Sequence, residues 1–211
     1  MKLRKLAGAT ALGVALAVLG SPLRAQDYDA SRIVAIGGSV TEIIYALGEE
    51  ERLIARDTTS VFPEAALELP DVGYIRQLSP EGVISVDPSL IIALEGSGPP
   101  EAVEVLEKAS IPMVTVPDRY DREGILEKIR IVGDVLDVED KAAALMAQAI
   151  AETIILDWEN VADRNGDMME YSPARAKQLL IDLPDLRQII MEEASKASNF
   201  IAKEVEEGQD F

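Results

Sequence analysis

A tyrosine and an arginine stand two residues apart on a glycine-led segment, and they offer the most specific chemistry in this chain. They are Tyr74 and Arg76, in the stretch Gly-Tyr-Ile-Arg at 73–76. An ionised phenol is a hard, anionic oxygen ligand that suits ferric iron, and tyrosine is one of the few side chains that hold haem iron axially. The chain has no His and no Cys, so the commoner haem ligands are absent.

The methionines, which can also bind haem iron, stand where packing explains them. They lie in apolar or helical contexts at Met113, Met146, Met168, Met169 and Met191. Tyr74 is therefore the candidate iron ligand, and with it the candidate metal-binding residue. Spacing alone favours a plainer interpretation, in which a tyrosine between a glycine and an apolar residue is a buried loop anchor.

The first 25 residues have the pattern of a secretory signal peptide. Basic residues within the first five positions precede an apolar run over 6–19, and the stretch 21–25 ends at Ala25, a suitable cleavage site. The run is shorter than the roughly 20 apolar residues of a membrane span. We therefore expect a periplasmic protein that does not insert into the membrane after signal cleavage. An uncleaved anchor helix is the alternative, and the lack of Cys excludes a lipid anchor.

Composition excludes several classes of function. The formal net charge of −18 argues against nucleic acid or an anionic membrane as a partner. Catalytic sets built on His or Cys cannot form, and no GxxxxGK[ST] phosphate loop is present. The carboxylate pairs at 192–193 and 206–207 are adjacent on predicted helices, so they point apart and suit a solvated face. We expect a binding protein, not an enzyme.

Four short apolar runs of the buried type alternate with helical segments and predict an α/β fold with a parallel sheet. The runs are 33–36, 53–55, 90–94 and 112–116. Ser39 and Glu42 have capping-box spacing, which predicts that Ser39 caps a helix that Gly48 closes. The segment 56–72 reads as a loop with a helical turn at 64–67.

Glycine-rich turns follow the first and third of these strands. Ligands of such sheets bind beyond the carboxyl ends of the strands, where glycines let a flat ligand approach the backbone and helix-starting amides can bind a carboxylate. A turn that needs glycine for its own conformation is an equally good explanation. The candidate binding residues here are Gly37, Gly38, Gly96, Ser97 and Gly98.

The pattern changes after residue 120. Helical spacing of apolar residues over 121–149 predicts a long linking helix, with a restart near Asp137. Residues 150–211 then follow a small ββαα pattern, with a turn at 163–167 and helices opening near Pro173 and Pro184.

Residues 30–147 resemble the haem-specific periplasmic substrate-binding proteins of ABC importers. Four blocks in the same order carry the resemblance: Ile33 to Gly48, Asp57 to Ser60, Leu69 to Ser79, and Glu95 to Glu101. The resemblance implies that Tyr74 is the axial haem ligand, that Arg76 hydrogen-bonds the phenolate or a propionate, and that Glu81 contacts the permease. Another iron porphyrin or a cobalamin-like ligand stays open, although cobalamin-binding relatives lack the Gly-Tyr-Ile-Arg block.

The resemblance also implies one Rossmann-like lobe over 26–120, joined by a stiff helix over 121–149 to a second lobe that is missing here. Three short stretches, 157–161, 171–173 and 198–200, carry a second resemblance. Through them residues 150–211 resemble small bacteriophage tail-assembly proteins, which act in the cytoplasm. A chimeric chain, a degraded importer gene running into phage sequence, or a divergent single protein would explain this, and we favour a chimera. We expect haem binding weakened by the missing lobe. The alternative function is an interaction module at 150–211, with Trp158 as either its binding anchor or a core residue.

Overall fold

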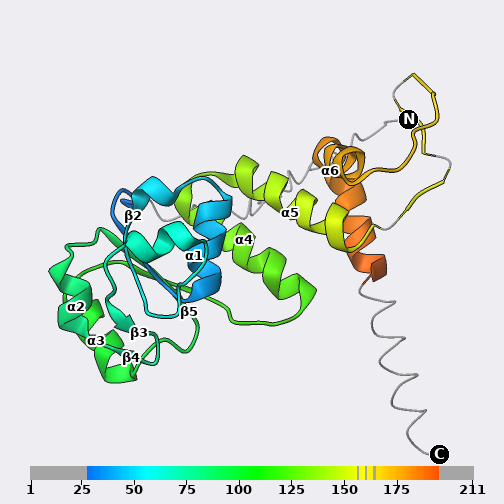
Figure 1. The fold of residues 1–211 in the computed structure, drawn as a ribbon. Helices are drawn as coiled ribbons and strands as arrows, with labels where there is room; N and C mark the ends of the chain where they lie inside the picture. The colour runs from blue at the N-terminus through cyan, green and yellow to red at the C-terminus, as the bar shows by residue number, and fades with distance from the viewer. Residues whose placement is uncertain (1–27, 156, 160, 164, 195–211) are drawn as a thin grey trace, which may run out of the picture.

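The computed structural model describes residues 28–155, 157–159, 161–163 and 165–194 (Figure 1). The predicted signal peptide, residues 1–25, lies outside the described residues. Within them, no helix combines the length and the apolar character of a membrane-spanning segment.

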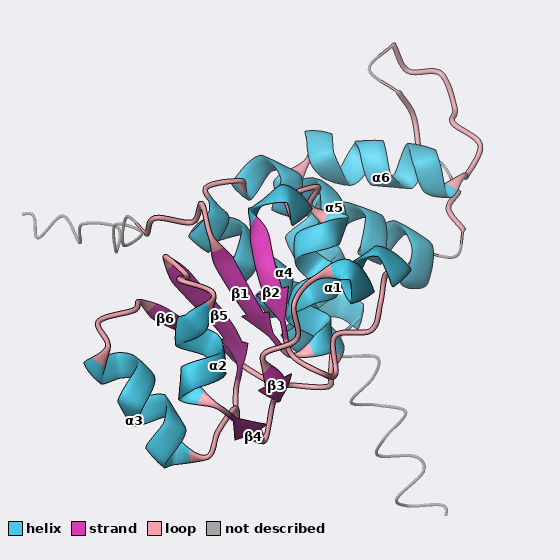
Figure 2. Cartoon of the chain, turned by 60° about the vertical axis from the view of Figure 1, so that its left-hand side comes forward, coloured by secondary structure: helices cyan, strands magenta, loops and turns pink. Residues whose placement is uncertain are grey.

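A four-stranded parallel sheet lies at the centre of the fold, as the sequence predicted (Figure 2). Its order is β2-β1-β5-β6, formed by β1 (Ile33–Ile36), β2 (Leu53–Arg56), β5 (Leu90–Leu94) and β6 (Met113–Val116). Successive residues of a strand point to opposite faces, so a strand covered on both faces is continuously apolar. Every residue of β1 is fully buried for this reason.

Helices cover both faces of the sheet (Figure 2). On one face, α1 (Gly38–Ala46) and α4 (Arg122–Leu136) pack on Ile33 and Ala35. On the other face, α2 (Pro80–Ser85) and α3 (Pro100–Lys108) pack on Val34 and Ile36. The short connections η1 (Glu50–Arg52) and η2 (Glu64–Glu68) complete this lobe, and η2 is the helical turn predicted near 64–67.

The predicted capping box at Ser39 is wrong. Gly37 is the N-cap of α1, with φ at 107°, and no side chain caps the helix. Because the helix begins at Gly38, Ser39 lies inside its first turn, where its buried hydroxyl has no hydrogen-bond partner among the described residues. Only glycine adopts such a φ readily, so the chain turns into the helix earlier than the side-chain pattern predicted.

A small hairpin that the sequence did not predict carries the tyrosine and the arginine. It pairs β3 (Gly73–Tyr74) with β4 (Gln77–Leu78) in antiparallel fashion. Two-residue strands are too short to produce a readable alternation.

The predicted linking helix over 121–149 consists of two helices, which meet at the restart predicted near Asp137. Asp137 adopts a left-handed conformation with φ at 58° and ends α4, and α5 (Glu139–Thr153) then packs back on α4. Gly133 lies against Ala142 with no room for a side chain between them. The two helices therefore form a close hairpin in place of a stiff rod.

The C-terminal region packs on α5. Helix α6 (Pro173–Asp182) buries Ala176 and Leu180 against α5, and Ser172 caps it by accepting a hydrogen bond from the Arg175 amide. Residues 184–194 are also helical, so both predicted helices are confirmed. The predicted pair of strands is reduced, within the described residues, to one bridge between Ala162 and Met168.

Trp158 belongs to this C-terminal core. Its ring meets that of Tyr171 edge to face at 5.3 Å, and its indole N–H donates to the Met169 carbonyl at 2.8 Å. Both rings pack with Ala147 and Ile150 of α5. This arrangement favours the core interpretation of Trp158 over the binding anchor.

Candidate functional site

The β3–β4 hairpin lies at the carboxyl edge of the sheet, between the loops that follow β2 and β5. The Thr58 amide donates to the Gly73 carbonyl at 2.9 Å, which ties the hairpin to the first loop. The Gly98 amide donates to the Ile75 carbonyl at 3.0 Å, and the Leu78 amide donates to the Gly98 carbonyl at 2.9 Å. The hairpin is thus fixed from both sides at the edge where ligands of such sheets bind.

Tyr74 is half-exposed, so it is not a buried loop anchor. Its side chain is 47% exposed, whereas its neighbour Ile75 is 7% exposed and packs in the core beneath the hairpin. Among the described residues, no hydrogen bond engages the Tyr74 hydroxyl. The phenol oxygen is therefore open to a ligand at this edge.

Arg76 extends from the same hairpin to the loop after β5. Its Nη1 donates a hydrogen bond to the Gly96 carbonyl oxygen. Gly96 has φ at +77°, and a Cβ at this position would collide with the guanidinium. Gly96 therefore makes room for the Arg76 side chain. The sequence pattern had instead suggested that this glycine lets a ligand approach the backbone.

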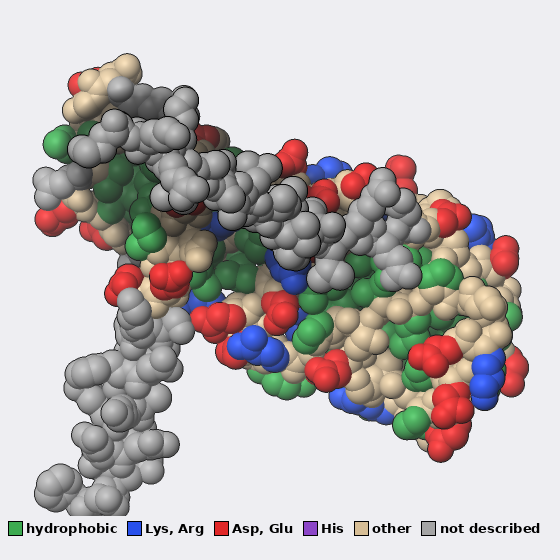
Figure 3. Space-filling view, turned by 180° about the vertical axis from the view of Figure 1, so that it is seen from behind, with side chains coloured by type: hydrophobic (Ala, Val, Ile, Leu, Met, Phe, Trp, Pro, Cys, Tyr) green, Lys and Arg blue, Asp and Glu red, His purple; other side chains and the backbone are tan. Residues whose placement is uncertain are grey.

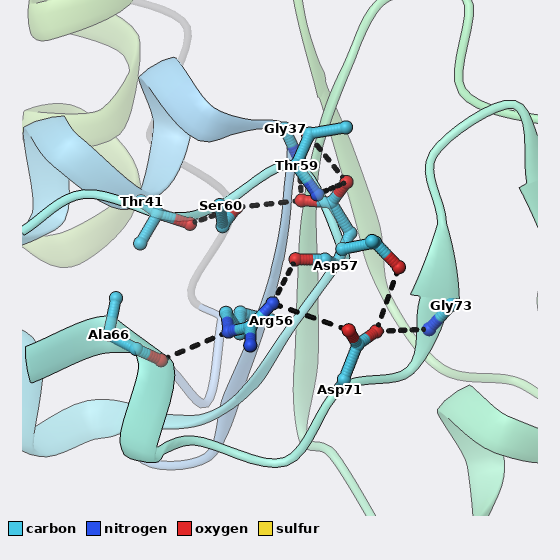
Figure 4. Close-up of polar contacts among 10 residues, drawn as sticks. Gly37, Thr41, Arg56, Asp57, Thr59, Ser60, Ala66, Asp71 and Gly73 are labelled. Atoms are coloured by element: carbon cyan, nitrogen blue, oxygen red, sulfur yellow. Dashed lines mark hydrogen bonds and ion pairs between the residues drawn. The ribbon is translucent and has the colours of Figure 1, made fainter. Parts of the chain in front are cut away.

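A fully buried carboxylate, that of Asp57, joins the loops after β1 and β2 (Figure 4). Its Oδ1 accepts from the Gly37 amide at 2.9 Å and from the Ser60 hydroxyl at 2.7 Å. Its Oδ2 accepts from the amide and the hydroxyl of Thr59 at 3.0 and 2.6 Å. These bonds satisfy a charge that would otherwise be costly to bury. The sequence pointed to Asp57 only as part of a resemblance block, without a role.

A second carboxylate, that of Asp71, holds the residue before Tyr74 (Figure 4). Its Oδ1 accepts from the Gly73 amide at 2.8 Å and from the Thr58 hydroxyl at 3.1 Å. Its Oδ2 pairs with Arg56 Nη1 at 3.4 Å, and Arg56 Nε donates to the Ala66 carbonyl. Gly73, at φ +106°, is thereby kept in the conformation that aims the hairpin.

The glycines and the serine of the predicted site have structural partners. A Cβ on Gly37 would lie 2.8 Å from Leu94 Cβ, so strand packing requires glycine there. A Cβ on Gly38 would lie 3.2 Å from a backbone oxygen. The Ser97 hydroxyl donates to the Leu94 carbonyl at 2.6 Å. Contact of these residues with a ligand stays a prediction.

Glu81 lies in the first turn of α2, exposed to solvent. Its Oε2 accepts from the Ser79 hydroxyl at 3.1 Å, and that hydroxyl also accepts from the Gly82 amide. The carboxylate is thus held at the surface next to the hairpin. Its contact with a permease stays a prediction.

The loop after β6 holds a tyrosine, Tyr120, that was not among the predicted site residues. Tyr120 is 87% exposed, and its hydroxyl donates to Asp118 Oδ2 at 2.6 Å. Asp118 Oδ1 accepts from Lys128 Nζ at 2.8 Å. The pKa of Asp118 lies below its usual range because of the hydrogen bonds from Lys128 and Tyr120, and the Asp118 carboxylate raises the pKa of Tyr120. The place of Tyr120 four residues after the predicted strand 112–116, at the ligand edge, was the signal available.

The lobe that carries this edge has known relatives. The family model for the periplasmic binding protein matches residues 33–154. The chain belongs to the periplasmic binding protein family. Solved members of similar fold include the periplasmic haem-binding protein BhuT in complex with two haems, at 39% identity and a TM-score of 0.54 over 57% of this chain. A periplasmic haem-binding protein from Pseudomonas aeruginosa matches at 37% identity with a TM-score of 0.52, also over 57% of this chain.

Curated relatives of this periplasmic binding protein include binders of another ligand. A vitamin B12-binding protein of Vibrio campbellii is 32% identical over 54% of this chain, and the ABC transporter substrate-binding lipoprotein YvrC of Bacillus subtilis is 31% identical over 54%. The chain spans 40% and 37% of these two relatives, and 49% and 46% of the two solved structures. The matched relatives are binding proteins.

A second family model, that of the YdaY prophage protein, matches residues 114–210. The phage-like character predicted for the C-terminal part is thereby confirmed. This match overlaps the periplasmic one over 114–154, the range that contains α4 and α5.

Proposed function

We propose that this chain is a periplasmic haem-binding component of an ABC importer, which binds ferric haem through Tyr74 and delivers it to the membrane permease. One observation carries the proposal. A half-exposed tyrosine, whose hydroxyl no described residue engages, stands beside an arginine at the carboxyl edge of a periplasmic-binding-protein lobe. The haem-binding proteins among its solved relatives support haem as the ligand.

The chemistry of the hairpin suits an anionic iron porphyrin. Tyr74 offers an oxygen that binds ferric iron once its proton leaves. Arg76 uses one N–H on Gly96, and a guanidinium has five such donors, so others remain for a propionate or for the phenolate. The Gly38 amide at the start of α1 would take a second propionate, whereas the Ser97 and Gly98 amides already donate to the Leu94 and Ile75 carbonyls.

The proposal also covers the location of the protein and its docking to a permease. Export rests on the predicted signal peptide at 1–25, and permease docking rests on Glu81. Acidic side chains are scattered among basic and apolar ones on the face in Figure 3, and the net charge of −18 fits a protein whose partners are neither nucleic acid nor anionic membrane. The lobe at 28–120 would form one wall of a haem cleft.

The alternative, an interaction module in the C-terminal part, rests on the prophage match. The packing of Trp158 and α6 on α5 favours a different role for that part, in which it covers the helical hairpin.

Parallel titrations with haemin and with cyanocobalamin test the ligand class. The mature protein should bind haemin at one equivalent with saturation, and cyanocobalamin should give no saturable signal at the same concentrations. Saturable cyanocobalamin binding without haemin binding would overturn the proposal and assign the lobe to the B12-binding group.

A further inference from the structure

The ring of Tyr120 is an exposed aromatic surface that the fold holds in place. At 87% exposed, it is the most exposed large apolar side chain among the described residues. Its hydroxyl is fixed to Asp118, and Lys128 Nζ lies 5.7 Å from the ring centroid, in range of a cation–π contact. An aromatic ring that only filled space would bury its faces, whereas this one is ordered with its face in water.

The groups that hold the ring are built into the core. Lys128 is 6% exposed and comes from the sheet-facing side of α4. Burying an ammonium group costs free energy that its pairing with Asp118 offsets. That pairing explains the positions of Lys128 and Asp118, and it leaves the outward placement of Tyr120 unexplained.

The loop of Tyr120 is joined to the candidate site. The Asp118 amide donates to Glu95 Oε2 at 3.1 Å, and Glu95 precedes the glycine whose carbonyl binds Arg76. The Arg76 charge also acts on this loop: after the hydrogen bonds from Lys128 and Tyr120 it adds to the lowering of the Asp118 pKa, and it opposes in part the rise that Asp118 causes in the Tyr120 pKa. Tyr74, Arg76 and Tyr120 therefore stand along one edge of the sheet, on the hairpin and at the end of β6.

The two tyrosines differ in chemistry. Tyr120 donates its proton to a carboxylate, which raises the pKa of its phenol, so it stays protonated at neutral pH and is a poor ligand for ferric iron. Its available surface is the face of the ring. Aromatic faces stack on flat conjugated ligands irrespective of any metal those ligands hold.

We propose that Tyr120 is a specificity-determining residue that stacks on the plane of a porphyrin, so that this edge recognises the macrocycle separately from its iron. The inference rests on the proposed function for the identity of the ligand. It divides recognition between two residues, with the iron bound at Tyr74 and the ring plane contacted at Tyr120.

Metal-free protoporphyrin IX separates the two contributions, because it has a ring plane and no iron. Fluorescence titration should show that Tyr120→Ala weakens protoporphyrin IX binding about tenfold, the value of one aromatic stacking contact. Tyr120→Phe, which keeps the ring, should lose less than about threefold. Tyr74→Phe should strongly weaken the binding of haemin, and it should weaken the binding of protoporphyrin IX by less than about twofold. Ile189→Ala, an exposed apolar residue of the C-terminal helix, is the matched control.

The outcomes distinguish this inference from the proposed function. If Tyr120→Ala has the same affinities for haemin and protoporphyrin IX as the unaltered protein, Tyr120 does not stack on the porphyrin, and the proposal of haem binding through Tyr74 stands. If the unaltered protein binds neither probe, both proposals fail. Because Tyr120 is exposed, its substitutions should leave the circular dichroism spectrum and the melting temperature unchanged.

Discussion

The guanidinium of Arg76 fills the space that a side chain on Gly96 would need, while its Nη1 donates a hydrogen bond to the Gly96 carbonyl. The lack of a side chain at Gly96 thus determines the direction of the Arg76 guanidinium on the hairpin that carries Tyr74. The candidate site depends on such contacts between loops, because its residues come from several connections at the edge of the sheet.

Gly96→Ala should therefore displace Arg76. We expect haemin affinity to fall about tenfold, since one charge-assisted hydrogen bond to a propionate or phenolate contributes on the order of 1.5 kcal/mol. Gly48→Ala is the matched control, because Gly48 has φ at +69° with nothing within 4 Å of the added Cβ. Both variants should lose about 1–2 kcal/mol of stability from backbone strain, and only Gly96→Ala should lose haemin affinity. Equal haemin affinities in the two variants would refute a role for the Arg76 position.

Asp57→Ala should destabilise the whole lobe. The substitution leaves the Gly37 and Thr59 amides without their buried partner, and we expect a loss of about 3 kcal/mol in the free energy of unfolding. Urea denaturation of Asp57→Ala and of Glu107→Gln measures the difference. Glu107 is exposed on α3, so its variant should stay within about 0.5 kcal/mol of the unaltered protein. A loss below about 1 kcal/mol for Asp57→Ala would contradict the role of this carboxylate.

Asp118→Ala should be more damaging than the joint removal of Asp118 and Lys128. The single variant leaves the Lys128 ammonium buried and unpaired, which costs about 3 kcal/mol or more. In Asp118→Ala/Lys128→Met the buried charge is gone, and we expect most of that stability to return. Thermal denaturation of both variants tests the pair, and a double variant no more stable than the single one would count against it.

The free energy of unfolding should fall in acid, partly because the Asp118 carboxylate becomes protonated. Its pKa is lowered in the folded protein by Lys128 and Tyr120, so the carboxylate contributes stability that is fully present at neutral pH. This contribution is lost as the pH falls from about 4, the unfolded carboxyl value, down through the lower folded pKa. Urea denaturation at pH 7 and at pH 3 should show a smaller acid loss in Asp118→Ala/Lys128→Met than in the unaltered protein. If both proteins lost the same stability between pH 7 and pH 3, the Asp118–Lys128 pair would make no contribution to the pH dependence.

The central sheet could be predicted because its information is local. Buried runs such as 33–36 and 90–94 are apolar at every position, and a parallel strand covered on both faces requires this. The errors arose where the backbone conformation of one residue decides the outcome. Gly37 displaced the expected cap at Ser39, and the left-handed Asp137 makes a hairpin of the expected stiff linking helix.

The candidate site was predictable only in part. Tyr74 and Arg76 were found because their types are chemically specific, and the structure places them together on one hairpin. The contacts of Asp57 and Asp118 join residues distant in the sequence, such as Asp57 with Gly37 and Asp118 with Lys128. No periodicity or motif encodes such pairings, so the support of Tyr120 by Asp118 and Lys128 became visible only in three dimensions.

The most direct test is the visible absorption spectrum of ferric haem bound to the mature protein and to Tyr74→Phe, which keeps the ring and removes the oxygen. Tyr45→Phe, on the far end of α1, controls for the loss of a phenol. We expect a tyrosinate-type spectrum for the unaltered protein and for Tyr45→Phe, and the spectrum of free haemin for Tyr74→Phe. A Tyr74→Phe spectrum identical to that of the unaltered protein would contradict iron ligation by Tyr74.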